Sequence, residues 1–138
     1  EVGSRSTSLS ASIVIGAHIT KVQAVFALYE DALVNNRVEV LDDLFWDSPH
    51  TVRYGATENL VGYAAIQAFR AARSPAGLAR RLQNTVITTY GTDAATAMTQ
   101  FVREGSSAIG RQSQTWVRMP GGWKVVAAHV SLLQGPPR

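Results

Sequence analysis

The chain contains no cysteine, which excludes disulfide bonds, thiolate metal ligands and a cysteine nucleophile. It also lacks any stretch near the roughly 20 consecutive apolar residues that a membrane-spanning helix needs. Its 13 lysines and arginines are scattered, and no basic run of the kind that binds nucleic acid occurs, although the net charge is +3. We therefore expect a soluble, cytoplasmic protein that binds neither nucleic acid nor a membrane.

The usual sequence signatures of metal and cofactor sites are missing as well. The three histidines, His18, His50 and His129, lie far apart, and no HExxH motif occurs. No glycine-rich phosphate loop precedes a helix, and no GxSxG motif is present for an activated serine. The sequence thus predicts neither a metal nor a cofactor.

The length of 138 residues, of which 46% are hydrophobic and 17% charged, indicates one ordinary globular domain. We place this single domain at residues 18–134. The serine-rich residues 1–17 lack helical periodicity, and the segment 135–138 begins Gly-Pro-Pro. We therefore expect a flexible N-terminal tail and a short C-terminal tail at these ends.

The first half of the domain shows helical spacing of its apolar residues. Thr20 and Gln23 form a capping-box pattern, which predicts a first helix that Asn35 and Asn36 end. The expected elements that follow are a helix over 38–45, a short strand over 51–54, a loop over 55–59 and a helix over 62–73.

The second half reads as strands joined by short turns rich in glycine. Four strands are expected, at about 80–90, 94–103, 110–118 and 123–133. Short connections imply antiparallel neighbours. Together the two halves predict an α+β fold: a cone-shaped, curved antiparallel sheet wrapped around the N-terminal helices, with one open end as a pocket.

The last strand has two faces with little polar character. In a regular strand, one face would carry Trp123, Val125, Ala127, His129 and Ser131, and the other would carry Lys124, Val126, Ala128, Val130 and Leu132. A sheet covered by its own helices on one side should be polar on the other. The second apolar face therefore predicts a homodimer.

Arg53 is the leading candidate for binding a small anionic molecule. Its guanidinium group is always charged, and its rigid fork of donors suits a carboxylate. It follows an apolar residue on the expected strand over 51–54, so it must meet an anion inside the domain. Either a bound carboxylate or an ion pair with Glu58 or Glu30 would meet that need.

Other residues that the pattern directs into the cone form a candidate polar, aromatic-lined cup. His129 is a candidate acid or base near neutral pH, although a histidine on an apolar strand is more often a core residue. Arg73, at the end of its helix, is a candidate for the mouth of the cone. The default interpretation is that Arg70 and Arg73, three residues apart, form an exposed, solvated pair. The other candidate binding residues are Trp46, Gln112, Gln114, Trp116 and Ser131.

Six segments of the chain carry a resemblance to a known family: ALYEDALV, LDDLFW, TVRYGATENLVGYAAIQAFRAAR, TVITTYG, GRQSQTWVR and GWKVVAAHVS. Broadly, the chain resembles the nuclear-transport-factor-two-like (cystatin-like) α+β superfamily, which includes the SnoaL-like proteins. More narrowly, it resembles the AtzH and HpxZ family, over Val22 to Leu133. That resemblance implies that a tyrosine of the first helix and the arginine of the RYG segment act in catalysis. They correspond to Tyr29 and Arg53.

The resemblance implies work beside amidases in ureide nitrogen catabolism. The leading hypothesis for the function is a cofactor-free enzyme. It would act on a ureido carboxylate, dicarboxyurea- or oxalurate-like, by deamidation or decarboxylation. Two alternatives stay open. One is a non-catalytic accessory module that binds an amidase, and the other is a SnoaL-like isomerase or hydrolase of a larger apolar substrate. A buried Tyr29 needs a hydrogen-bond partner. In an enzyme of this kind the partner would be the substrate, and in a purely structural role it would be the backbone.

Overall fold

The computed structural model describes residues 18–135, so the tail expected at 1–17 and all but the first residue of the tail at 135–138 lie outside the described residues. Two helices come first, then two short strands, a third helix and four long strands. They are α1 (Ile19–Val34), α2 (Val38–Leu44), β1 (Val52–Tyr54), β2 (Asn59–Val61), α3 (Tyr63–Ala72), β3 (Arg80–Tyr90), β4 (Ala94–Arg103), β5 (Gly110–Met119) and β6 (Gly122–Leu132).

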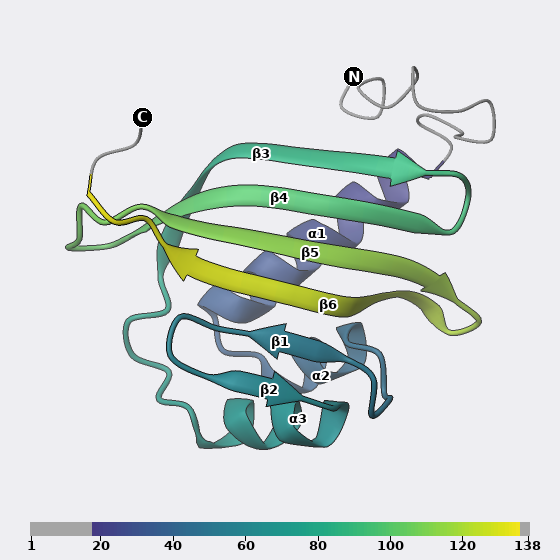
Figure 1. The fold of residues 1–138 in the computed structure, drawn as a ribbon, viewed down its shortest axis with the longest axis horizontal. Helices are drawn as coiled ribbons and strands as arrows, with labels where there is room; N and C mark the ends of the chain where they lie inside the picture. The colour runs from purple at the N-terminus through teal and green to yellow at the C-terminus, as the bar shows by residue number, and fades with distance from the viewer. Residues whose placement is uncertain (1–17, 136–138) are drawn as a thin grey trace.

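The strands form one six-stranded sheet in the order β2-β1-β6-β5-β4-β3 (Figure 1). Strands β3 to β6 make the expected antiparallel meander, since each turn between them is short. β1 pairs with β6 in parallel, which the long stretch of chain between them permits. The α+β prediction is confirmed, with one parallel pair in a sheet that was expected to be wholly antiparallel.

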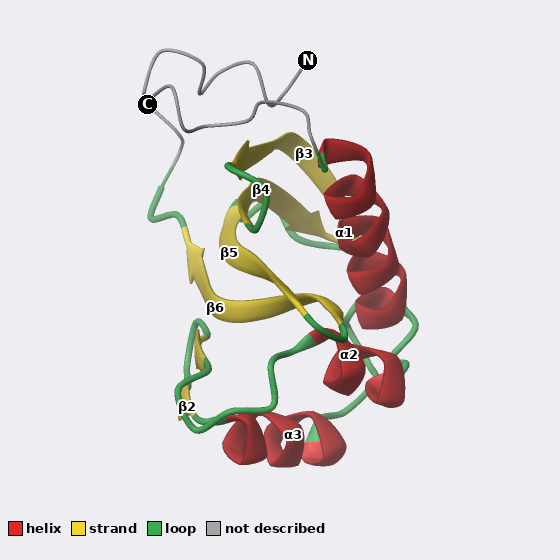
Figure 2. Ribbon diagram, turned by 90° about the vertical axis from the view of Figure 1, so that its right-hand side faces the viewer, coloured by secondary structure: helices red, strands yellow, loops and turns green. Residues whose placement is uncertain are grey.

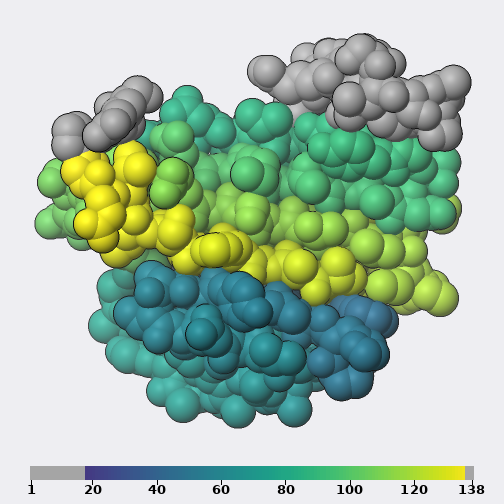
Figure 3. All heavy atoms as spheres, viewed as in Figure 1, coloured from purple at the N-terminus to yellow at the C-terminus, as the bar shows by residue number. Residues whose placement is uncertain are grey.

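The helices cover one face of the curved sheet. α1 lies along its inner face, and α2 and α3 lie near the end of the cone (Figure 2). The outer face carries none of the described helices; Figure 3 views it with β6 in yellow across the middle. The core lies between helices and sheet, and its fully buried members include Val22, Ala32, Leu41, Ile66, Ala95, Ala97, Trp116 and Val125.

The first helix begins differently from the capping-box prediction. The N-cap is His18, without a side-chain hydrogen bond, so Thr20 lies inside the first turn. Ile19 packs against the core, and this contact favours a start two residues earlier than an N-cap at Thr20 would give. The predicted end of the helix is confirmed. Asn36 adopts a φ of 52°, a left-handed conformation that asparagine tolerates and through which a right-handed helix cannot continue.

The sequence did not predict β2. Residues 55–59 were expected to be a loop, but Gly55 donates its N–H to the Glu58 carbonyl at 2.8 Å, and this tight turn pairs β1 with β2. A strand of three residues is too short to show a period.

None of the helices in residues 18–135 is long and apolar enough to cross a bilayer.

Candidate active site

Five guanidinium groups form a connected set between the helices and the sheet, in which each lies near enough to at least one other to affect its ionisation. They come from one short strand, the end of a helix and two long strands: Arg53 on β1, Arg70 on α3, Arg73 just after α3, Arg80 on β3 and Arg103 on β4. We call these five residues the arginine cluster. Like charges in one place repel, so the cluster needs anions to balance it.

Three of the five arginines have a carboxylate partner. Arg80, whose side chain is 2% exposed, grips Glu30 of α1 with two hydrogen bonds of 2.8 and 2.7 Å. Arg53 donates from Nη1 to Glu58 at 2.7 Å. Arg70 contacts Asp42 of α2 at 3.4 Å, a weaker bond.

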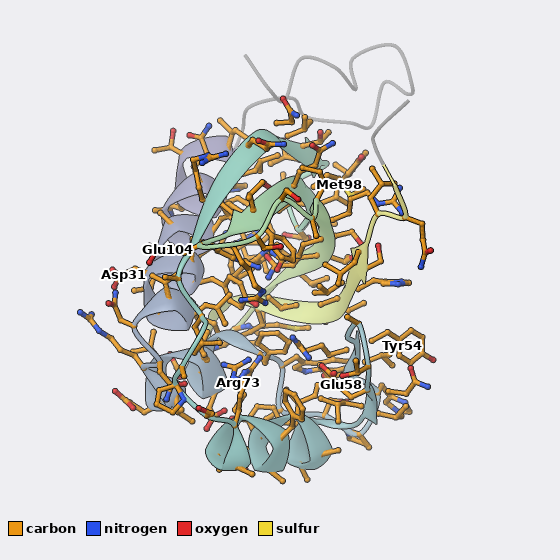
Figure 4. The ribbon with its side chains drawn as sticks, turned by 90° about the vertical axis from the view of Figure 1, so that its left-hand side faces the viewer. Asp31, Tyr54, Glu58, Arg73, Met98 and Glu104 are labelled. Carbon is orange, nitrogen blue, oxygen red and sulfur yellow. The ribbon has the colours of Figure 1, made fainter. Side chains whose placement is uncertain are left out.

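The other two arginines leave the cluster with two excess positive charges. Arg103 donates to the carbonyl of Gly77 at 2.9 Å, and neither it nor Arg73 has a carboxylate partner among residues 18–135. Nε and Nη2 of Arg73 are buried and have no acceptor there. Figure 4 shows Arg73 projecting from the end of α3 into the layer that also holds Glu58, below the sheet.

More donors without acceptors lie on the inner face of β5. Gln112 accepts a hydrogen bond from Arg80, and Gln114 accepts one from the indole of Trp116 at 3.0 Å. Both partners can only donate, so each amide must turn its oxygen toward them. The amide nitrogens of Gln112 and Gln114 then stay buried without an acceptor among the described residues, as does Nη2 of Arg70. These donors suit an anionic or carbonyl-rich molecule.

Burial lowers the pKa of Arg70, Arg73 and Arg103. Nearby guanidinium charges lower these pKa values further. Burial also raises the pKa of the Glu58 carboxyl, but hydrogen bonds from Arg53 and Thr57 outweigh that effect, so its pKa lies below the usual 4.5. Glu58 is therefore ionised at neutral pH and balances one charge of the arginine cluster.

Aromatic rings contact the guanidinium groups of the arginine cluster. Arg70 stacks 4.0 Å from the ring centroid of Phe45, and Arg80 stacks 4.5 Å from that of Phe101. Arg53 and Arg73 both approach Phe69, at 5.6 and 6.0 Å. Such contacts offset part of the cost of removing a guanidinium group from water.

Tyr29 lies on α1, facing the arginine cluster. It is 3% exposed, and its phenol is within electrostatic range of Arg70, Arg73 and Arg103. Its hydroxyl makes no hydrogen bond to another residue in the range 18–135. The backbone partner expected of a purely structural tyrosine is absent from that part of the chain, so the hydroxyl can serve a ligand.

The structure brings together five of the residues that the sequence singled out: Tyr29, Arg53, Arg73, Gln112 and Gln114. Arg53 faces inward as expected and forms an ion pair with Glu58. This ion pair is one of the partners that the sequence left open for Arg53. Only its Nη1 is used by a described residue, so Nε and Nη2 remain open to a ligand.

Two of the other candidates lie elsewhere within the fold. Trp116 is fully buried and serves the core. Trp46 lies beside His50, with ring centroids 6.4 Å apart, and lines a surface hollow with Asp47 and Lys124.

The predicted position of His129 and Ser131 inside the cup is wrong. A bulge in β6 places Val125 opposite Trp116 but Ala127 opposite Thr115, so β6 contains one extra residue there. An extra residue reverses the facing of every side chain after it. His129 and Ser131 therefore lie on the outer face, where they line a groove of about 360 Å³ with Met98 and Arg111.

The expectation that Arg70 is exposed is also wrong, since it is 2% exposed. The sequence held a signal for it: Arg70 lies four residues after the buried Ile66, on the same helical face as Phe69 and Arg73. Arg80 and Arg103 were missed too. They lie opposite one another in register on β3 and β4, a pairing that requires knowledge of the strand register.

A family model described as AtzH-like matches residues 12–136. The search of curated proteins finds no match.

Two solved structures are similar over most of the chain. One, from Pectobacterium atrosepticum, is described as a protein of unknown function from the DUF3225 family; it is 57% identical, with 91% of this chain and 98% of that chain covered and a TM-score of 0.88. The second, a cystatin-like fold protein from Burkholderia xenovorans, is 49% identical, with 86% and 93% covered and a TM-score of 0.81.

A third structure shows the fold alone. It is an NTF2-like protein from Pseudomonas putida, 16% identical, with 81% and 84% covered and a TM-score of 0.66. The cystatin-like, NTF2-like fold that the resemblance implied is thereby confirmed. Because the family model spans all of the described residues 18–135, the chain belongs to the AtzH-like family.

Proposed function

We propose that this protein is a cofactor-free enzyme that removes ammonia or carbon dioxide from a small ureido carboxylate. The observation that carries the proposal is Tyr29, a residue that is 3% exposed beside the arginine cluster and whose hydroxyl makes no hydrogen bond to a described residue. The large aromatic residues nearby, Phe45, Phe101 and Trp116, are at most 2% exposed and fill the interior as core. This packing favours a small substrate over a polycyclic one.

Arg53 and Tyr29 have separate roles in this proposal. Arg53 holds a substrate carboxylate through Nε and Nη2, while Glu58 keeps the guanidinium in place through Nη1. Tyr29 donates its hydroxyl proton in a hydrogen bond to the urea carbonyl oxygen. In deamidation, water adds to the carbonyl carbon and the C=O pair moves to its oxygen; the carbonyl then re-forms as the C–NH₂ bond breaks and ammonia leaves. In decarboxylation, the N–CO₂ bond breaks, carbon dioxide leaves, and the electron pair delocalises toward the carbonyl until the nitrogen takes a proton from water. Both routes place negative charge on the same oxygen, where a fixed donor lowers the barrier.

Tyr29→Phe should lower kcat about 100-fold, because it removes one donor from the oxygen that gains charge. Arg53→Ala should instead weaken substrate binding and raise KM. Release of ammonia and carbon dioxide from dicarboxyurea and from oxalurate would be measured on the purified protein. Tyr90→Phe is the matched control, since Tyr90 is 36% exposed on the outer face and contacts only Thr96 through its hydroxyl.

Turnover that survives unchanged in folded Tyr29→Phe and Arg53→Ala variants would refute this role. A wild-type protein that releases neither product but retains a neighbouring amidase in a pull-down would favour the accessory module instead.

We also propose that two copies of the chain associate through the outer face of the sheet. This face lacks a covering helix among the described elements and exposes large apolar side chains, with Met98 at 50% and Tyr54 at 43%. An uncovered sheet face with such side chains is typical of an interaction surface. A second copy offers the same apolar surface, so the two faces can cover each other about a two-fold axis.

Met98→Glu should raise the dimer dissociation constant at least about tenfold, because a charged carboxylate must leave water where an apolar side chain made contact. Sedimentation velocity at micromolar concentration measures the change. Leu28→Glu is the control, since Leu28 is 44% exposed on α1, away from this face. A monomeric wild-type protein would contradict the proposed dimer.

A further inference from the structure

The outer face of the sheet, viewed in Figure 3, holds a groove that the proposed enzyme activity does not use. The groove has a volume of about 360 Å³ and lies on the opposite side of the sheet from the arginine cluster. We propose that it is a second binding site, for a small organic molecule that carries a phosphate group. His129 and Ser131, which the sequence assigned to the interior, belong to this site together with Arg111 and Ser113 of β5.

These four polar side chains lie next to one another across β5 and β6. In the register of the two strands, Ser113 is opposite His129 and Arg111 is opposite Ser131. Each pair is two residues from the other along its strand, so all four side chains leave the same face of the sheet. Side chains directly opposite on one face have Cβ atoms about 5 Å apart, so the four can contact one ligand group. The ring of Tyr54 meets that of His129 edge-on, with 6.2 Å between centroids, and supports it on this face.

The Arg111 guanidinium group has no counter-ion in the described part of the chain. It takes part in none of the ion pairs or side-chain hydrogen bonds of residues 18–135. The hydroxyls of Ser113 and Ser131 and the ring nitrogens of His129 also lack a hydrogen-bond partner in that range. No aspartate or glutamate lines the groove. A concave surface with one cation, several donors and no acid attracts an anion more strongly than an arginine on a flat surface does.

β4 adds an amide donor and an apolar wall to the groove. Gln100 accepts hydrogen bonds at its side-chain oxygen from Gln83 at 3.2 Å and from Asn84 at 3.1 Å. Its amide nitrogen makes no hydrogen bond to a residue in the range 18–135, so it is available to a ligand. Met98 is 50% exposed and lines the same groove, where its side chain can contact the apolar part of a ligand.

A phosphate group matches these donors better than a carboxylate does. It has three terminal oxygens and a charge of about −1.5 to −2 at neutral pH, whereas a carboxylate has two oxygens and a single charge. Arginine binds phosphate through two parallel hydrogen bonds, which leaves a third oxygen for the hydroxyl groups. The volume of about 360 Å³ is that of a site for a small molecule.

The groove lies on the face assigned to the proposed dimer. A second copy would cover the groove and remove Arg111 from water, which would increase the need for an anion there. The site itself does not depend on the dimer, because one chain supplies every residue that lines it.

The test follows the C–H signals of the three histidine rings by NMR while phenyl phosphate is added to the full chain at constant pH. The His129 signals should move and then saturate, because this ring lines the groove. The other two histidines are internal references, since His18 lies beside Trp123 and His50 lies beside Trp46, and neither lines the groove. The spectrum of His129→Gln assigns the signals.

Arg111→Gln should weaken the binding of phenyl phosphate at least about tenfold, because it removes a charged contact with two donors. Arg111→Lys keeps the charge but loses the planar fork, so its affinity should lie between those of the wild type and Arg111→Gln. Arg81→Gln is the matched control. Arg81 is also an exposed arginine of the sheet, but it lines a different hollow with Val102, so this variant loses the same charge and should bind as the wild type does.

Two other probes define the class of ligand. Inorganic phosphate has no apolar part to contact Met98, and benzoate has one oxygen fewer and less charge. Each should therefore bind at least about threefold more weakly than phenyl phosphate. Benzoate that binds as tightly would overturn the assignment of a phosphate group, and inorganic phosphate that binds as tightly would overturn the assignment of an organic ligand.

Arg53→Ala separates the groove from the interior, since Arg53 belongs to the arginine cluster. The response of His129 should be unchanged in this variant, and its loss would mean that phenyl phosphate binds inside instead. His129 signals that do not respond in the wild type, or an Arg111→Gln variant that binds as tightly as the wild type, would also overturn the inference. A protein that shows the Arg111-dependent response but turns over no ureido acid, or stays monomeric, would contradict those earlier proposals and leave the outer site standing.

Discussion

Glu30→Ala is expected to lower the free energy of unfolding by about 3 kcal/mol. Glu30 holds Arg80 with two hydrogen bonds, and the Arg80 side chain is 2% exposed. Removing the carboxylate leaves a buried guanidinium without its counter-ion, in a cluster that already has two excess positive charges. The expected cost lies at the lower end of the range for buried pairs because the Glu30 side chain is 17% exposed.

The neighbouring residue in the chain provides the matched control. Asp31 follows Glu30 on α1 and also pairs with an arginine, Arg37, but the two side chains are 51% and 54% exposed. Exposed pairs contribute little, so Asp31→Ala should change stability by less than about 1 kcal/mol. Urea unfolding of both variants, monitored by far-ultraviolet circular dichroism, gives the comparison. Equal losses in the two variants would show that burial of the Arg80 pair contributes nothing.

The long strands could be predicted closely because their turns are explicit in the sequence. The expected ranges 80–90 and 94–103 coincide with β3 and β4, and those of the last two strands differ from β5 and β6 by a residue at one or both ends. Gly91 and Gly105 adopt positive φ angles of 64° and 77°, where glycine is favoured over other residues. Between such turns, the alternation of apolar and polar residues then defines each strand.

The facing of side chains within a strand was less predictable. A period of two assigns every residue of a strand to a face only if no residue is inserted. The bulge between Val125 and Ala127 lies opposite Thr115 and Trp116 of the neighbouring strand, and nothing in the local sequence marks it. Trp123 and Val125 precede the bulge and are buried, whereas His129 and Ser131 follow it, so their predicted place inside was wrong.

The candidate site was predictable one residue at a time but not as a cluster. The burial of Tyr29 follows from helical periodicity and its place in the site from the family resemblance, whereas Arg53 follows from a charge placed in an apolar strand. The inward turn of Arg70 and the pairing of Arg80 with Glu30 depend on elements that are 28 and 50 residues apart in sequence. A periodic pattern reports burial, whereas partners at such separations depend on the tertiary arrangement.

Gly110→Ala is expected to destabilise the fold by about 3 kcal/mol. Gly110 begins β5 directly opposite Phe101 of β4, and the Phe101 ring covers the space that a Cβ would occupy. Phe101 is 1% exposed and lies beneath the guanidinium groups of Arg80 and Arg103. The ring cannot move aside without shifting the Arg80–Glu30 pair, so a single methyl group disturbs both the core and the arginine cluster.

Gly121→Ala separates this steric effect from the general effect of replacing a glycine. Gly121 lies in the turn between β5 and β6, and the nearest atom to its added Cβ would be Cε of Lys124 at 4.0 Å. The same substitution there should change stability by no more than about 0.5 kcal/mol. Thermal and urea unfolding of the two variants measure the difference. A Gly110→Ala protein as stable as Gly121→Ala would mean that Phe101 can leave its position at little cost. The packing of that ring beneath Arg80 would then contribute little to holding the cluster together.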